Sequence, residues 1–248
     1  MVRFFVSPPD ISGDAIRLAP GDSAHIRSLR LRPDERFIVC DGSGTDYVCR
    51  LDETGAGAKS RDSRAIIEGA EPSAGEPTVR CTAYIAYAKG DRLDYAVQKS
   101  VELGVGDIVL YPSARCVSAP GDVPKRVSRL LRISLETAKQ CGRGRVPSVT
   151  AADSFESAIA AAGRGARHLP LFFYELEKES NLKRALEGRG EFATASIVTG
   201  PEGGFEPFEA ELAVSRGLLP VSLGPRILRC ETAPVAALAA IMHHTGNL

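Results

Sequence analysis

Two segments near the C-terminus carry the residue types of ligand-binding loops. The first is Gly200-Pro-Glu-Gly-Gly204, directly after the apolar run Ile197-Val-Thr199. Gly203 and Gly204 permit positive φ, and a loop with so little side-chain bulk lets a ligand approach the backbone closely. It is neither a dinucleotide G-x-G-x-x-G pattern nor a P-loop. Glu202 would repel a phosphate, so the loop favours a cationic or neutral ligand. An ordinary strand-to-helix turn is the alternative interpretation.

The second segment is Leu223-Gly-Pro-Arg-Ile-Leu-Arg-Cys-Glu-Thr232, followed shortly by Pro234. Proline is tolerated only in the first turn of a helix, so a helix should begin near Glu231 or Thr232. Residues 224–230 then form a loop that places Arg226 and Arg229 beside a helix N-terminus, a typical site for anions. A surface salt bridge would explain one arginine, and two in a Gly-Pro loop favour anion binding.

The elements that must position these loops alternate between strand and helix after residue 77. Apolar runs predict strands over 79–87, 108–111, 169–174, 195–199 and 220–223, and helical spacing predicts helices over 91–103, 127–141, 154–162, 180–187, 206–215 and 232–243. Such alternation indicates an α/β domain in which helices cover both faces of a parallel sheet. Sites in these sheets lie on the loops after the carboxyl ends of strands, where both glycine segments fall.

Residues 1–74 instead predict short strands and turns, typical of a small β-barrel. Asp41-Gly-Ser-Gly44 is a hairpin turn between the runs 37–40 and 47–49. The pattern over 22–30 predicts a short helix opened by an Asp22 cap, and 53–63 is a polar loop. The stretch 71–77, rich in Pro, Gly and Glu, predicts a linker. We therefore expect two domains, 1–74 and 75–248.

The charge balance excludes a uniformly basic nucleic-acid binder. The 248 residues include 31 Lys+Arg and 31 Asp+Glu, so the formal net charge is zero. Local basic patches remain compatible with that average. Residues 25–32 contain three arginines and no acid, and residues 124–145 contain seven basic residues against Glu136. Each patch suits either RNA phosphates or a solvated helix face.

The cysteines and the apolar runs indicate the cellular compartment in which we expect the protein. The six cysteines are scattered, with no C-x-x-C pair, so we expect reduced thiols and no metal site. No run approaches the roughly 20 apolar residues that a membrane span needs. The apolar part of the first residues is too short for a signal peptide. We expect a cytoplasmic protein that makes no contact with a membrane.

The two glycine segments together resemble the C-terminal motifs of the SPOUT-class methyltransferases. Further matching segments make the chain similar to the bacterial 16S ribosomal RNA (uracil-N3)-methyltransferase family over nearly its whole length: Arg3-Phe-Phe5, His25-Ile-Arg-Ser-Leu-Arg-Leu-Arg32, Asp41-Gly42, Ala88-Lys-Gly-Asp-Arg92, Gln98-Lys-Ser-Val-Glu-Leu-Gly-Val105 and Gln140-Cys-Gly-Arg143. Cys230 stands where the family pattern has threonine or a similar small residue, and Pro234 where a plainer helix former is usual. A small thiol fits the same space.

The resemblance implies a fold, a donor and a substrate. It implies a PUA-like RNA-binding barrel followed by a SPOUT-type, trefoil-knotted parallel sheet, in a homodimer whose interface includes the apolar run 235–242. That run also suits a helix packed inside its own domain. The implied donor is S-adenosylmethionine, without a metal. The implied acceptor is N3 of a uridine in 16S rRNA, within the small ribosomal subunit.

The resemblance also assigns residues to roles. Donor binding falls to Phe173, Tyr174, Thr199, Gly200, Glu202, Gly203, Leu223, Gly224 and Leu228. Methylation of N3 displaces an imide proton, so Arg229 or Arg226 would stabilise the developing anion. Glu231 is the nearest carboxylate for a base, or it favours the helix N-terminus instead. The expected RNA contacts are Arg3, His25, Arg27, Arg30, Arg126 and Arg143.

Two other functions stay open on the sequence. One is a SPOUT enzyme that methylates another RNA position, such as a ribose 2′-hydroxyl. The other is a non-catalytic RNA-binding assembly factor with the same fold. An oxidoreductase that depends on a nucleotide cofactor is disfavoured, because no phosphate-binding fingerprint is present.

Overall fold

A computed structural model describes residues 1–52, 63–117 and 121–248. The chain divides into two compact units, one of Met1–Glu76 with Ala138–Val146 and one of Pro77–Thr137 with Pro147–Leu248. The expected domains, 1–74 and 75–248, differ from these units mainly in residues 138–146, which were expected in the second domain and belong to the first unit. The expected polar loop 53–63 lies outside the described residues except for Ser63.

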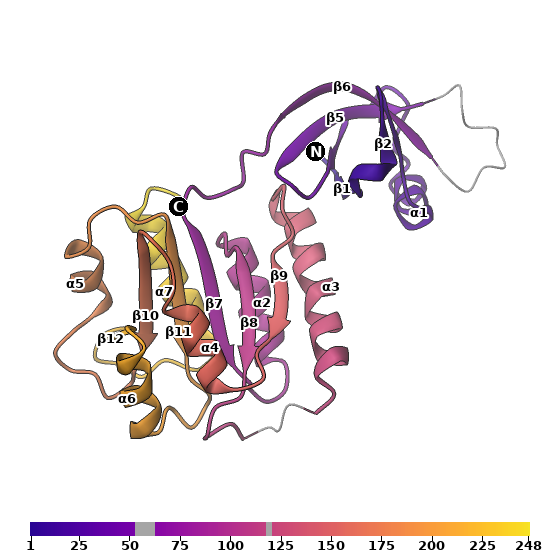
Figure 1. The fold of residues 1–248 in the computed structure, drawn as a ribbon. Coiled ribbons are helices and arrows are strands. Elements are labelled where there is room, and N and C mark those ends of the chain that lie inside the picture. The colour runs from indigo at the N-terminus through magenta and orange to yellow at the C-terminus, as the bar shows by residue number, and fades with distance from the viewer. Residues whose placement is uncertain (53–62, 118–120) are drawn as a thin grey trace. The chain divides into compact units, whose positions relative to one another are not determined.

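In the part of the chain that the structure describes, the first unit contains a curled six-stranded sheet, the helix α1 (Pro20–Leu29) and the segment 138–146 (Figure 1). Its strands are β1 (Arg3–Phe5), β2 (Ile11–Ser12), β3 (Ala15–Arg17), β4 (Phe37–Cys40), β5 (Thr45–Leu51) and β6 (Arg64–Pro72), in the order β1-β4-β5-β6-β3-β2. β1 and β4 pair in parallel, and the other pairs are antiparallel. The short 3₁₀ helix η1 (Pro8–Asp10) precedes β2.

Aromatic and aliphatic side chains fill the concave side of this sheet. The Phe4 ring lies 5.7 Å from Phe37 and 5.8 Å from His25, both edge-on. α1 (Pro20–Leu29) contributes Ile26 to the same core. The expected Asp22 cap is wrong, because Pro20 opens the helix and Ala19 is its N-cap. Proline suits that first position because its missing N–H has no partner there.

A buried ion pair joins the first strand to the hairpin. The Arg3 guanidinium donates to both carboxylate oxygens of Asp46, at 2.6 and 2.7 Å, and to Cys40 Sγ. Ser73 Oγ and Cys40 Sγ also donate to Asp46. Burial opposes ionisation of Asp46, but the bonds from Arg3, Ser73 and Cys40 outweigh it and lower the pKa of the carboxyl.

Segment 138–146 belongs to the first unit because Glu76 binds it. The Glu76 carboxylate accepts hydrogen bonds from the Arg143 guanidinium and from the amides of Gly144 and Arg145, both at 3.0 Å. A Cβ at Gly144 would overlap the Ser73 side chain. Glycine is therefore required where this segment passes Ser73, directly after β6.

The second unit is a parallel sheet with helices on both faces, as the alternation predicted. Its strands are β7 (Arg80–Ala86), β8 (Asp107–Tyr111), β9 (Ser148–Ala151), β10 (His168–Phe173), β11 (Thr194–Thr199) and β12 (Leu219–Val221), in the order β12-β10-β11-β7-β8-β9. Every neighbouring pair is parallel. β9 was not predicted, because four residues of mixed character leave a weak pattern.

The helices of this unit form two groups. They are α2 (Arg92–Glu102), α3 (Val123–Cys141), α4 (Phe155–Ala162), α5 (Leu182–Glu187), α6 (Pro207–Ser215) and α7 (Thr232–His244). α4 packs with α6, while α7 packs with α2 and α5 (Figure 1). Phe155, Phe172 and Phe205 fill the core under α4, with ring centroids 4.4 to 6.5 Å apart. Among the described residues, no helix is long and apolar enough to cross a membrane.

Replacing Asp46 by Asn should lower the free energy of unfolding by about 3 kcal/mol, because Arg3 would be left as an uncompensated buried charge. Asp10→Asn is the matched control. Its partner Arg17 is 71% exposed, so the loss should stay under about 1 kcal/mol. Urea titration followed by circular dichroism compares the two variants, and equal losses would contradict the structural role of the Arg3–Asp46 pair.

Candidate functional site

Three neighbouring strands of the second unit end at the same level. Phe173 of β10 pairs in register with Thr199 of β11 on one side and with Val221 of β12 on the other. The loops that follow these strands therefore emerge side by side. They line a pocket of about 470 Å³. Both glycine segments lie in its wall, as predicted from their place after strands.

The glycines of the first loop make room for neighbouring groups. A Cβ at Gly200 would lie 2.9 Å from the Phe205 ring. Gly204 has a φ of +71°, and a Cβ there would overlap the Glu175 carboxylate. That carboxylate accepts a hydrogen bond of 2.9 Å from the Phe205 amide. The two glycines thus allow the loop to fold against Phe205 and Glu175.

Glu202 is tied to the turn between β7 and α2. Its Oε1 accepts hydrogen bonds from the Lys89 amide at 2.9 Å and from the Arg92 guanidinium at 2.6 Å. Burial opposes ionisation, but these bonds and the charge of Arg92 outweigh it and lower the pKa of Glu202. Glu202 is therefore an ionised, paired carboxylate beside the pocket.

The second loop leaves its backbone available. Within the described chain, the main-chain groups of residues 223–228 make no hydrogen bond to other main-chain groups. Polar backbone groups normally find a partner, which is solvent or a ligand here. Gly224 has a φ of +102° and open space at its missing Cβ. α7 begins at Thr232 with Pro234 in its first turn, which confirms the prediction from proline.

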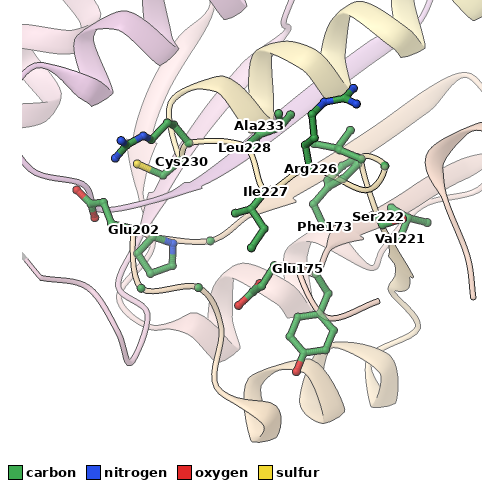
Figure 2. A pocket seen from close by; sticks show the side chains of 18 of the residues that line it. Phe173, Glu175, Glu202, Val221, Ser222, Arg226, Ile227, Leu228, Cys230 and Ala233 are labelled. Atoms are coloured by element: carbon green, nitrogen blue, oxygen red, sulfur yellow. The ribbon is translucent and has the colours of Figure 1, made fainter. Parts of the chain in front are cut away.

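Figure 2 shows how the labelled side chains lie around this pocket. Ile227 and Glu175 reach towards its centre, and Ile227 is 86% exposed. Glu202 and Cys230 lie together on one flank, whereas the Arg226 guanidinium points away from the other labelled groups. The centre of the pocket thus combines an apolar side chain, a carboxylate and free backbone.

Most of the predicted donor-binding residues line this pocket. Phe173, Tyr174, Gly200, Glu202, Gly203, Leu223, Gly224 and Leu228 belong to its wall. Thr199 is not among the lining residues. It is buried at the end of β11, where its carbonyl accepts a hydrogen bond of 2.7 Å from the Tyr111 hydroxyl.

The three predicted catalytic residues are not equivalent in the structure. Arg226 and Arg229 both line the pocket and are exposed. Glu231 is not among its lining residues. Its Oε2 accepts a hydrogen bond of 3.2 Å from the Cys230 thiol and lies 3.7 Å from Arg92 Nε. Burial, with that bond, raises the pKa of Cys230 to about 12, so the thiol stays protonated.

Three residues that line the pocket or fasten its loops were not predicted from the sequence. Glu175 directly follows the predicted strand, and its position in the first loop after β10 was the available signal. Arg115 donates to the Gly203 carbonyl at 3.2 Å and to Glu206 at 2.8 Å. The buried Glu209 carboxylate accepts from Ser113 Oγ and from the Ala114 amide. These contacts fasten the loop after β8 to the first glycine loop through Gly203 and to α6 through Glu209.

The predicted RNA contacts divide by exposure. His25, Arg27 and Arg30 are exposed on and after α1. Arg3 and Arg143 are enclosed by Asp46 and Glu76, so they hold the first unit together. Arg126 is half-buried, with its guanidinium 5.5 Å from the centroid of the Tyr87 ring. Among the described residues, no cluster of His, Cys, Asp and Glu could hold a metal ion.

Comparison with known proteins gives concordant matches. The RNA methyltransferase domain family matches residues 75–242, and the RNA methyltransferase PUA domain family matches 18–57. The ribosomal RNA small subunit methyltransferase E of Bacillus subtilis is 29% identical over all of this chain and 98% of its own length. Its namesake from Synechocystis is 30% identical over 96% of this chain and 76% of its own.

A solved structure agrees with these matches. The ribosomal RNA small subunit methyltransferase E of Neisseria gonorrhoeae, bound to S-adenosyl methionine, superposes with a TM-score of 0.85 at 30% identity. It covers 98% of this chain and 97% of its own.

Gly204→Ala should destabilise the fold and disturb the pocket together. The positive φ costs about 1–3 kcal/mol for a residue with a Cβ, and the new methyl group must also displace Glu175. Gly217→Ala is the control, since Gly217 has a φ of +86° and open space around its missing Cβ. Thermal melting should show a larger loss for Gly204→Ala, and losses of equal size would contradict the close approach of Glu175.

The pairing of Glu202 should appear in the pH dependence of stability. The folded-state pKa lies below the ordinary value of 4.5, so the folded state binds fewer protons than the unfolded state. The stabilisation is complete above pH 4.5 and is lost as the pH falls through the lower folded value. The melting temperature of the wild type should exceed that of Glu202→Gln at neutral pH and converge with it in acid. A difference that persists in acid would contradict the pairing.

Proposed function

The chain belongs to the RNA methyltransferase family, and from that premise we propose that it transfers a methyl group from S-adenosylmethionine to N3 of a uridine in the 16S rRNA of the small ribosomal subunit. The observation that carries this proposal is the pocket at the ends of β10, β11 and β12, which lies inside the matched region 75–242. The PUA match at 18–57 supports RNA as the substrate.

The residues present fit S-adenosylmethionine. A volume of about 470 Å³ lies in the usual range for small-molecule sites. The free backbone of 223–228 offers donors and acceptors for an adenine edge and ribose hydroxyls. Gly200 and Gly203 belong to the wall formed by the first loop, and their missing Cβ atoms leave room for Phe205 and Arg115 behind that wall. The donor carries no phosphate, which agrees with two carboxylates, Glu175 and Glu202, among the lining residues.

The chemistry requires positioning and a place for negative charge. S-adenosylmethionine supplies a methyl group bonded to a sulfonium sulfur. Negative charge would develop on the uracil ring as its imide proton passes to a base or to solvent, and transfer of the methyl group from sulfur to N3 would then neutralise it. Arg229, exposed at the pocket and next to α7, would stabilise this charge. Holding the methyl donor in line with N3 of the uracil would supply much of the remaining rate enhancement.

Further parts of the proposal concern assembly. We expect His25, Arg27 and Arg30 to contact RNA phosphates, since all three are exposed. Ala237, Leu238, Ile241 and Met242 of α7 are buried within the chain, whereas Val235, Ala236, Ala239 and Ala240 are half-exposed. The half-exposed residues would form the interface of a homodimer. A trefoil knot, action on the small ribosomal subunit and a cytoplasmic location complete the proposal.

Arg229→Ala should abolish methylation and leave donor affinity within about twofold, because Arg229 is assigned to the charge that develops on the acceptor. Mass spectrometry of 16S rRNA nucleosides from a deletion strain measures the product, and calorimetry measures donor binding. The plasmid-borne wild type should restore 3-methyluridine, and the variant should not. A lost ribose methyl group would instead indicate a 2′-hydroxyl acceptor. Full activity of the variant would remove Arg229 from the mechanism.

A further inference from the structure

The two loops that bound the donor pocket have no direct connection. Within the described residues, no hydrogen bond or salt bridge links 200–204 to 222–231. The loops follow different strands, β11 and β12, which are separated by β10 in the sheet. Their spacing therefore depends on groups outside both loops.

Arg92, the first residue of α2, contacts a carboxylate from each side of the pocket. Its NH1 donates to Glu202 of the first loop at 2.6 Å, and its Nε lies 3.7 Å from Glu231 at the end of the second. The Lys89 amide, from the same turn, donates to Glu202 as well. Gly90, with a φ of +61°, forms this turn. The β7–α2 turn thus bridges both loops from outside the pocket.

The bridge is partly shielded from water, unlike a surface ion pair. The side chains of Arg92, Glu202 and Glu231 are 36%, 20% and 23% exposed. A guanidinium presents several N–H donors in a fixed plane, so it can serve two carboxylates at once, which a lysine ammonium does less well. The Cys230 thiol donates to the same Glu231 oxygen, Oε2, that lies near Arg92, and so helps to hold that carboxylate in place.

We propose that Arg92 is a positioning residue for donor binding: it holds Glu202 and Glu231 together and so fixes the spacing of the two pocket loops. This inference rests on the proposed function. It gives Glu231 a structural partner, so the second loop is anchored through a carboxylate beside the pocket. Arg92 is not among the residues that line the pocket, so its effect reaches the donor through the loops.

Removing the bridge should weaken donor binding more than catalysis. If the loops hold the competent spacing about a tenth of the time without Arg92, the apparent Kd rises about tenfold. Arg92→Ala should therefore raise the Kd and KM for S-adenosylmethionine about tenfold and leave kcat at saturating donor within about twofold. Arg92→Lys keeps the charge and should recover part of the affinity.

The experiment is calorimetric titration of the full-length protein with S-adenosylmethionine, with melting temperatures and methyl-transfer kinetics. Its variants are Arg92→Ala, Arg92→Lys, Glu202→Gln and the double variant Arg92→Ala/Glu202→Gln. Arg80→Ala is the matched control: Arg80 pairs with Asp107 at 2.7 Å at the amino-terminal end of β7, whereas the pocket lies at the carboxyl ends of the strands. Donor affinity should stay at the wild-type value in this control.

The double variant should bind the donor no more weakly than Arg92→Ala alone, since both changes break one bridge. Wild-type affinity in Arg92→Ala would overturn the inference. Additive losses of affinity in the double variant would also overturn it. The same holds if Arg92→Lys does not restore affinity and the loss of affinity is accompanied by a lowered melting temperature. Failure of the wild type to bind S-adenosylmethionine would instead refute the proposed function.

Discussion

The site depends on the register of three parallel strands. Hydrogen bonding sets Phe173 beside both Thr199 and Val221, so the chain leaves β10, β11 and β12 at one level. A shift of one strand by a single residue would reverse its buried and exposed side chains, and the packed faces of the sheet oppose such a shift. Buried aromatic residues on one face, including Phe172 and Phe205, therefore help to fix where the loops begin.

This arrangement makes main-chain N–H and C=O groups available for binding a ligand in the pocket. Two glycine-bearing loops bring main-chain groups to the pocket, and those of residues 223–228 make no hydrogen bond to other backbone in the part of the chain that the structure describes. Two carboxylates complete the wall. Glu175 projects inwards (Figure 2). The charge of the ionised Glu202 is balanced by Arg92. Such a pocket suits a ligand without phosphate, and under the proposed function Arg229 would act on the acceptor.

Much of the architecture was predictable because it follows from the order of residue types within short segments of the sequence. The strand–helix alternation predicted the parallel sheet, and Pro234 predicted the start of α7. Long-range contacts were not predictable from spacing. Neither the order β12-β10-β11-β7-β8-β9 nor the attachment of 138–146 through Glu76 has a local signal. Arg3 and Arg143 were expected to contact RNA, and no local pattern shows that Asp46 and Glu76 pair with them inside the fold.

We assign donor binding to the loops after β10, β11 and β12. A crystal structure of this chain with S-adenosylmethionine is the decisive measurement. We expect the donor between loops 200–204 and 222–230, with its adenine or ribose bonded to main-chain groups of 223–228 and Arg92 contacting both Glu202 and Glu231. A donor bound elsewhere, or one that leaves the 223–228 backbone uncontacted, would refute the assignment.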